Sequence, residues 1–296
     1  MIKPTVKWFA VVAIAATFSA CGDSATKSAE TTTPTDTASQ AATYEKNVET
    51  VIDELPTASE IPALLESTGA EYNATLANPL SKESSYTTTT GKAALNLGVY
   101  AADLSYLCVY DKAQDALSYI KTAQKLAQHI GVVTPNVEAV QKRVESNLSN
   151  KDSLISIVNQ TIAVSDKYLK ENQQHNVAAL VVVGGFVEGL YVATSVAEKY
   201  PKDLPKEVRS GVLTQLVRTV ADQEKPLADL VKLLGTVPAS AEIDDLKKQL
   251  EELQQAYTSL NLSQKIKENK GDMVLDDTTI APIAAKVKEI RNKIVS

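Results

Sequence analysis

The stretch VAALVVVGGFVEGLYVA, residues 177–193, decides the fold class, because this segment alone could form either a buried strand or a buried helix. Its β-branched residues favour a strand. Its length, its lack of proline and its continuation in helical register favour a helix. We interpret it as a helix. Since no other segment alternates convincingly with a period of two, the sequence predicts an all-α protein.

Helical periodicity extends over most of the chain. Apolar residues recur at three- and four-residue steps before Gly131, which is placed as a helix stop: Leu117, Ile120, Ala123, Ala127 and Ile130. Similar patterns predict helices at roughly 59–77, 87–109, 136–147, 152–172, 176–199, 205–235, 241–262 and 279–295. We expect a multi-helix bundle that forms a single domain, residues 44–296.

Two apolar seams predict a coiled-coil-like helical hairpin at the C-terminus, about residues 241–295. The first seam has steps of 3-4-3-4-3 and consists of Ile243, Leu246, Leu250, Leu253, Tyr257 and Leu260. The second has steps of 3-4-3-4 and consists of Ile280, Ile283, Val287, Ile290 and Ile294. The segment between them contains Gly271, so the two helices could lie antiparallel.

The N-terminus has the order of an export signal. Lys3 and Lys7 precede an apolar run of 13 residues, Trp8 to Ala20. That run is shorter than the roughly 20 residues that a membrane-spanning helix needs. We therefore expect residues 1–20 to be a signal peptide that is removed. We expect no apolar run of 18 residues after it.

The end of this segment, Phe18-Ser19-Ala20-Cys21, resembles the lipobox of bacterial lipoproteins, with Phe18 in place of the usual Leu. The resemblance implies that Cys21 is lipidated and becomes the first residue of the mature chain. Two or more acyl chains give stable membrane anchoring. Gly22 stands where an Asp retains lipoproteins in the inner membrane, so the resemblance implies a lipid-anchored protein of the bacterial cell envelope, in the outer membrane. Whether the protein lies on the periplasmic or the outer face of that membrane stays open.

We interpret residues 21–43 as the lipidated cysteine followed by a flexible tether. Gly22 to Thr43 contain no Val, Ile, Leu, Met or aromatic residue and are dominated by Ala, Thr and Ser. Such a segment cannot bury enough apolar surface to offset the entropy of ordering it. We expect it to link the lipid to the folded domain.

Charge and cysteine content restrict the partners. The net charge of the chain is −6, and loss of the two signal-peptide lysines makes it more negative. Such a surface disfavours nucleic acid and anionic lipid as direct partners. Cys108 is the one other cysteine, so an intramolecular disulfide is not expected.

Two stretches resemble a group of uncharacterised helical lipoproteins of Bacteroidetes-type bacteria. They are LPTASEIPALLESTGAEYNATLANP, residues 55–79, and YTTTTGKAALNLGVYAADLSYLCVYDKAQDALSYIKTAQKLAQHIGV, residues 86–132. The resemblance covers about residues 55–135. It implies an all-α body on a lipid anchor, and it implies no activity.

Motifs of catalysis and of metal or cofactor binding are missing from the sequence. The two histidines, His129 and His175, have no carboxylate or second histidine three or four residues further on. No glycine-rich phosphate loop or serine nucleophile elbow is present. We therefore expect a protein that is not an enzyme and has no cofactor and no metal.

Glycines are unusually frequent in the apolar helix. Gly184, Gly185 and Gly189 each cost about 1 kcal/mol relative to alanine in a helix. We interpret them as the point of close approach to a second helix around Gly98; space for a ligand is the alternative. GVYAADLSY at 98–106 weakly echoes GGFVEGLYV at 184–192, which favours an internal duplication without proving it.

Polar residues form two stripes on these apolar helices. Asn96, Tyr100, Asp103, Tyr106 and Tyr110 follow steps of 4-3-3-4, and Glu188, Tyr191 and Ser195 follow steps of 3-4. We expect Asp103 and Glu188 to face a common, tyrosine-lined seam between neighbouring helices. A carboxylate there must be hydrogen-bonded or have a raised pKa.

Two functions from different classes stay open at this point. The first is a non-enzymatic helical scaffold or interaction module, with a protein partner on its helical surfaces and contact with the membrane through the lipid alone. The alternative is a helical bundle that holds a small molecule along the Asp103/Glu188 seam.

Overall fold

The computed structural model describes residues 65, 69–132, 137–172, 174–262, 264 and 277–296. All regular secondary structure within these residues is helical, which confirms the all-α prediction. The predicted signal peptide, Cys21, the tether and residues 44–64 of the predicted domain lie outside the described residues.

The chain forms α-helices joined mostly by short connections, with two short 3-10 helices, η1 and η2. In chain order the elements are η1 (Leu80–Lys82), α3 (Glu83–Tyr86), α4 (Thr90–Val109), α5 (Ala113–His129), α6 (Val137–Glu145), α7 (Lys151–Glu171), α8 (His175–Lys199), α9 (Lys206–Ala221), α10 (Glu224–Leu234), α11 (Ala241–Leu260), η2 (Asp277–Ile280) and α13 (Ala281–Ile294).

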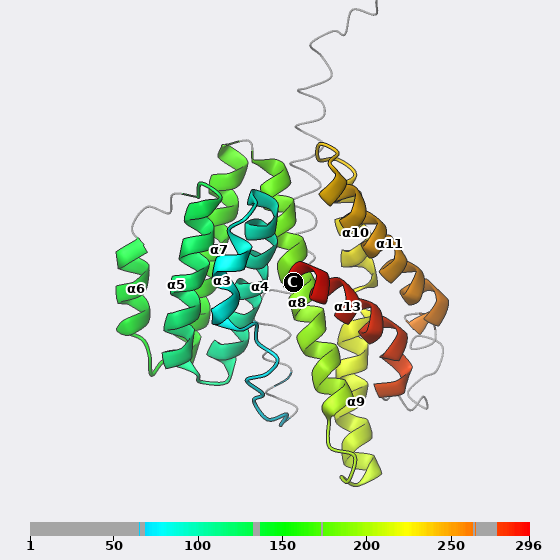
Figure 1. Cartoon of the computed structure of the whole chain (residues 1–296). Coiled ribbons are helices and arrows are strands. Elements are labelled where there is room, and N and C mark those ends of the chain that lie inside the picture. Colours follow the sequence, from blue (N-terminus) through cyan, green and yellow to red (C-terminus); the bar gives the residue numbers. More distant parts are fainter. Residues whose placement is uncertain (1–64, 66–68, 133–136, 173, 263, 265–276) are drawn as a thin grey trace, which may run out of the picture.

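Helices α4 and α8 form the centre of the bundle and have the most extensive contact of any two described elements. In Figure 1, α8 runs between a group formed by α3 to α7 and a group formed by α9, α10, α11 and α13. α5 and α7 pack on α4, and α13 packs on α8. The stretch 177–193 lies inside α8, so its prediction as a helix is confirmed.

Glycine permits the close approach of α4 and α8. A Cβ atom added at Gly184 would lie 1.9 Å from the carbonyl oxygen of Leu95, and one at Gly98 would lie 2.0 Å from that of Val181. In each case the partner precedes the opposite glycine by three residues, so the crossing is reciprocal. Backbone approach, the packing interpretation of the sequence, therefore explains both glycines.

Helix α8 is also long and apolar enough to cross a membrane, so the expectation that no such run follows the signal segment is wrong. However, 72% of its most apolar window is buried inside the protein. Its neighbours include α4, α7, α9 and α13. This burial is typical of the central helix of a bundle, which is apolar all round.

Two predicted helices differ from the structure. The part of 59–77 that is described after residue 68 forms turns and coil. In this part the backbone N–H of Asn73 donates to the side chain of Tyr106, and that of Leu76 donates to the carbonyl oxygen of Asn73 in a turn. The predicted helix 205–235 is divided into α9 and α10 after Ala221. Pro226 explains the division, because a proline inside a helix clashes with the carbonyl group four residues earlier.

The ends of other helices follow the sequence pattern. α5 ends at His129, and Gly131 follows with φ +80°, the left-handed conformation of a helix stop. Both C-terminal seams are buried apart from the half-buried Leu260. α11 contacts α13, and Lys286 of α13 forms an ion pair with Glu252 of α11. α13 packs more extensively on α8 than on α11, so the C-terminal pair is part of the bundle.

Candidate functional site

Asp103 of α4 and Glu188 of α8 meet at the centre of the bundle. They lie five and four residues after the crossing glycines Gly98 and Gly184, so both point into the interface just past the crossing. Both residues are fully buried, and their carboxyl groups are within hydrogen-bond reach of each other. The structure therefore brings together the two acids that the sequence singled out.

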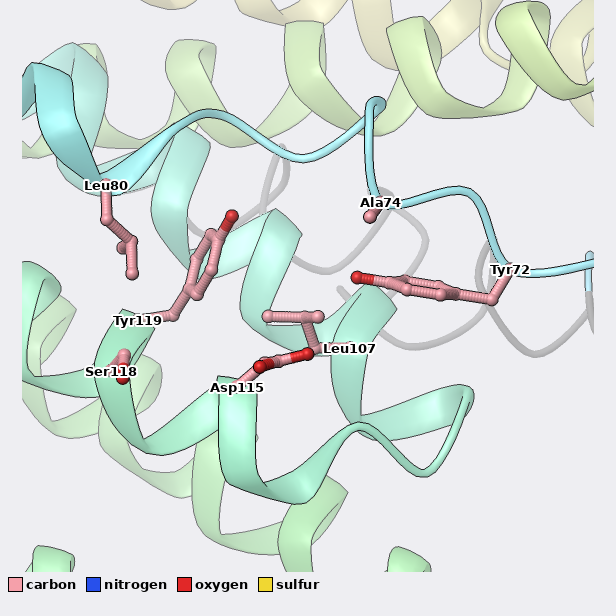
Figure 2. A pocket seen from close by; sticks show the side chains of 7 residues that line it. All are labelled: Tyr72, Ala74, Leu80, Leu107, Asp115, Ser118 and Tyr119. Atoms are coloured by element: carbon pink, nitrogen blue, oxygen red, sulfur yellow. The ribbon is translucent and has the colours of Figure 1, made fainter.

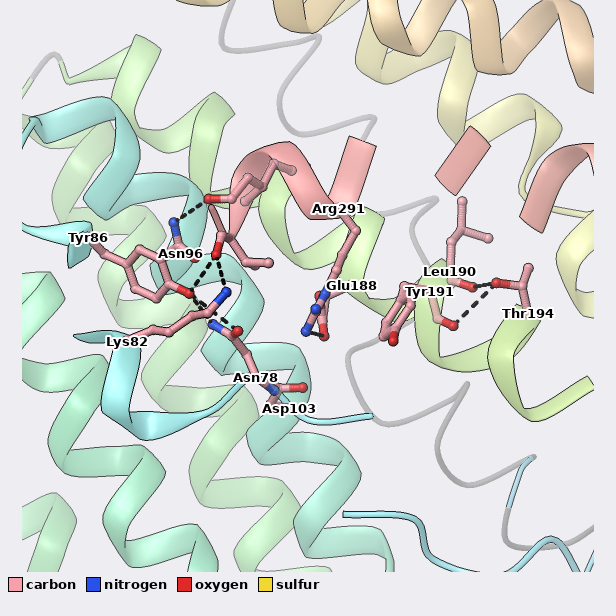
Figure 3. Close-up of polar contacts among 12 residues, drawn as sticks. Asn78, Lys82, Tyr86, Asn96, Asp103, Glu188, Leu190, Tyr191, Thr194 and Arg291 are labelled. Carbon is pink, nitrogen blue, oxygen red and sulfur yellow. Dashed lines mark hydrogen bonds and ion pairs between the residues drawn. The ribbon is translucent and has the colours of Figure 1, made fainter. Parts of the chain in front are cut away.

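Arg291 of α13 completes this group, and sequence reasoning missed it. Its Nε and Nη2 atoms donate to Oε2 and Oε1 of Glu188 at 3.0 and 3.1 Å (Figure 3). Two parallel bonds of this kind are the strongest form of an arginine–carboxylate pair. The guanidinium also lies over the ring of Tyr191, 4.5 Å from its centroid. Glu188 thus fixes the C-terminal helix to the central one.

Asp103 has a different set of partners from Glu188. Its Oδ2 atom accepts a hydrogen bond of 2.9 Å from the backbone N–H of Asn78. Burial, followed by the negative charge of Glu188, raises the pKa of Asp103 well above its ordinary value. Burial also raises the pKa of Glu188, but Arg291 opposes this rise through its charge and its hydrogen bonds. Of the two carboxyl groups, Glu188 is the better stabilised as an anion.

The buried tyrosines hold the coil before η1. Tyr106 Oη accepts from the backbone N–H of Asn73 at 3.0 Å, and Tyr100 Oη donates to the carbonyl oxygen of Pro79 at 2.9 Å. Tyr119 Oη donates to the carbonyl oxygen of Asn78, also at 2.9 Å. These side chains satisfy peptide groups that a helix would have satisfied internally. They explain how a non-helical segment can lie against the core.

The last residues of the chain are held in the same region. Asn96 Nδ2 donates to the carbonyl oxygen of Ile294 at 3.0 Å. Lys82 Nζ and Tyr86 Oη donate to the carbonyl oxygen of Val295 at 2.8 and 3.3 Å (Figure 3). The polar seam therefore joins α4 and α8 to the coil before η1 on one side and to the C-terminus on the other.

The seam contains six of the eight residues predicted for it. Asn96, Tyr100, Asp103, Tyr106, Glu188 and Tyr191 make the contacts described above. Tyr110 is half-buried, and its ring packs on those of Tyr106 and Tyr72 at centroid distances of 5.0 and 5.8 Å. Ser195 is buried on α8 but takes no part in the hydrogen bonds among the described seam residues. Besides Arg291, the sequence interpretation missed Asn78, Tyr86 and Tyr119.

No protein-family model, curated protein or solved structure matches the chain. The seam and the surfaces around it are therefore the basis for a functional conclusion.

One surface pocket of about 310 Å³ lies near the seam, between α5 and the coil before η1 (Figure 2). It is lined by Tyr72, Ala74, Leu80, Leu107, Asp115, Ser118 and Tyr119. None of the eight predicted residues lines it. Within the described residues, no group of three or more histidine, cysteine, aspartate or glutamate side chains could hold a metal ion.

Proposed function

We propose that the protein is a non-enzymatic helical scaffold or interaction module, held at the bacterial envelope by a lipid on Cys21. The observation that supports the scaffold is the use of the seam's polar groups within the chain itself. Asp103 and Glu188 are fully buried and bond to Asn78 and Arg291. The buried polar residues thus serve to fix the positions of the helices.

The alternative, a small molecule held along this seam, has less support. A ligand that bonded to Oδ2 of Asp103 would have to displace the backbone N–H of Asn78, and one that bonded to the carboxylate of Glu188 would have to displace Arg291. The nearby thiol of Cys108 is not poised for catalysis either. It is buried, and burial raises its pKa to about 12, so it is a poor nucleophile at neutral pH.

Native mass spectrometry of the full-length protein, extracted from membranes in mild detergent, tests this proposal. We expect the mass of the lipidated chain, together with complexes that contain a second protein at a fixed ratio. The matched variants are Asp103→Asn and, as a control at the exposed surface away from the pocket, Asp244→Asn. A small molecule bound at one per chain in the wild type and the control, and absent from Asp103→Asn, would support the ligand-binding alternative instead.

A further inference from the structure

We propose that Asp103 and Glu188 form a buried proton-binding site, in which one proton bridges the two carboxyl groups and joins α4, α8 and α13. The site follows from a count of charges and of hydrogen-bonding atoms. Two carboxyl groups and one guanidinium lie together, and both acids are fully buried. Among the residues that the structure describes, one carboxyl is therefore left without a counter-ion, and burial of an unpaired charge is strongly unfavourable.

The hydrogen-bonding atoms indicate where the proton resides. Both oxygens of Glu188 accept from Arg291. In Asp103, Oδ2 accepts from the backbone of Asn78, whereas the buried Oδ1 has no partner among the described residues while the carboxyl is ionised. A proton on Asp103 allows it to donate to Glu188, which lies within reach. The proton therefore satisfies the remaining atom and removes the excess charge in one step.

The described groups around Asp103 supply no other counter-ion. The tyrosines near Asp103 come from the coil before η1 and from α3, α4 and α5, and burial raises the pKa of each, so they are neutral: Tyr72, Tyr86, Tyr100, Tyr106 and Tyr119. Lys82 of η1 bonds to the carbonyl oxygen of Val295, and Tyr191 of α8 lies against Arg291. Among the described residues, Arg291 is the cation whose charge acts on Asp103.

The bridge connects parts of the chain that are distant in sequence. Through Asn78 it reaches the coil before η1, and through Arg291 it reaches the C-terminal helix. Loss of the proton would place a second negative charge beside Glu188, and the two carboxylates would repel each other. The attachment of both outer elements to α4 and α8 is therefore linked to proton binding.

Infrared spectroscopy of the wild-type protein at neutral pH tests the site directly, because a protonated carboxyl has a carbonyl stretch that a carboxylate lacks. We expect one protonated carboxyl per chain. Its band should be lost in Asp103→Asn and retained in Asp115→Asn, which changes an exposed acid of α5. A wild-type spectrum without this band would overturn the proposal even if the variants failed to fold. A band unchanged in Asp103→Asn would also overturn it.

A second variant separates a shared proton from one that burial alone retains. In Glu188→Gln, one carboxyl is left beside Arg291, so Asp103 should ionise and the band should disappear. If burial alone holds the proton, the band will persist in Glu188→Gln, and the bridge is refuted. Hydrogen exchange of the α13 amides gives an independent readout. Corrected for the intrinsic rate, exchange should rise with pH in the wild type and stay constant in Asp103→Asn.

Discussion

Replacement of Arg291 by methionine should destabilise the protein strongly. The change removes both hydrogen bonds to Glu188 and leaves that fully buried carboxylate without its counter-ion. Removal of one partner of a buried ion pair costs about 3–5 kcal/mol. Methionine retains most of the apolar stem, so little of the loss comes from packing. Since small domains have unfolding free energies of about 5–15 kcal/mol, the expected loss is a large fraction of the total.

Urea unfolding, followed by far-ultraviolet circular dichroism, measures this loss as a change in the free energy of unfolding. The chain is produced without residues 1–20 and with serine in place of Cys21. Lys293→Gln is the matched control on the same helix. The side chains of Lys293 and Glu289 are each 52% exposed and 3.8 Å apart, so this change should cost no more than about 1 kcal/mol.

A double variant tests whether the loss comes from the unpaired charge of Glu188. When Glu188→Gln accompanies Arg291→Met, no charge is left buried and unpaired, and the amide oxygen of glutamine can still accept from Asp103. The double variant should therefore be more stable than Arg291→Met alone, a departure from additivity that marks residues in contact. Equal, small losses of unfolding free energy in Arg291→Met and Lys293→Gln would refute a stabilising role of the buried pair between Arg291 and Glu188.

The remaining predictions concern the anchor and the packing. Cys21→Ser should abolish incorporation of labelled fatty acid, and labelling at the wild-type level would refute the lipid anchor. Leu250→Asp should cost about 3 kcal/mol or more, because Leu250 is fully buried and the new charge would have no partner; an unchanged melting temperature would contradict this. Gly184→Ala should cost about 3 kcal/mol, since its Cβ would lie 1.9 Å from a backbone oxygen. In Gly185→Ala the Cβ would lie 3.5 Å from the carbonyl oxygen of Gly98, an ordinary van der Waals contact, so the higher helix propensity of alanine should leave stability unchanged or raise it by up to about 1 kcal/mol; similar losses in the two variants would contradict the close approach of α4 and α8 at Gly184.

Local patterns in the sequence predicted the central helices and their meeting point. Asp103 and Glu188 stand out because a carboxyl in an apolar helix must find a partner. The crossing glycines stand out because each has an energetic cost that only close packing offsets. Both signals depend on neighbours within a few turns of the same helix, so they can be recognised without knowledge of the tertiary structure.

Residues that depend on contacts distant in sequence were not predicted. Arg291 lies 103 residues from Glu188 and resembles the solvated basic residues around it. A signal was present, since Ala284, Val287, Arg291 and Ile294 recur at steps of 3-4-3, which places the arginine within the apolar stripe. The coil before η1 was assigned to a helix because its apolar residues have helical spacing. Its hydrogen bonds to Asp103 and Tyr106 become visible only in the folded chain.

The pH dependence of unfolding in the wild type and in Asp103→Asn tests the proton-bridged junction most directly. Because the pKa of Asp103 is higher in the folded chain than its unfolded value of about 3.9, folding takes up a proton between these two values. Wild-type stability should therefore decrease, relative to Asp103→Asn, as the pH rises above about 4, with a slope that approaches 1.4 kcal/mol per pH unit until the folded pKa is passed. The asparagine variant cannot ionise, and its amide can donate to Glu188 in place of the proton. We expect the stability difference between the two proteins to grow from pH 5 to pH 8 in favour of Asp103→Asn. A difference that stays constant over this range would contradict the bridge.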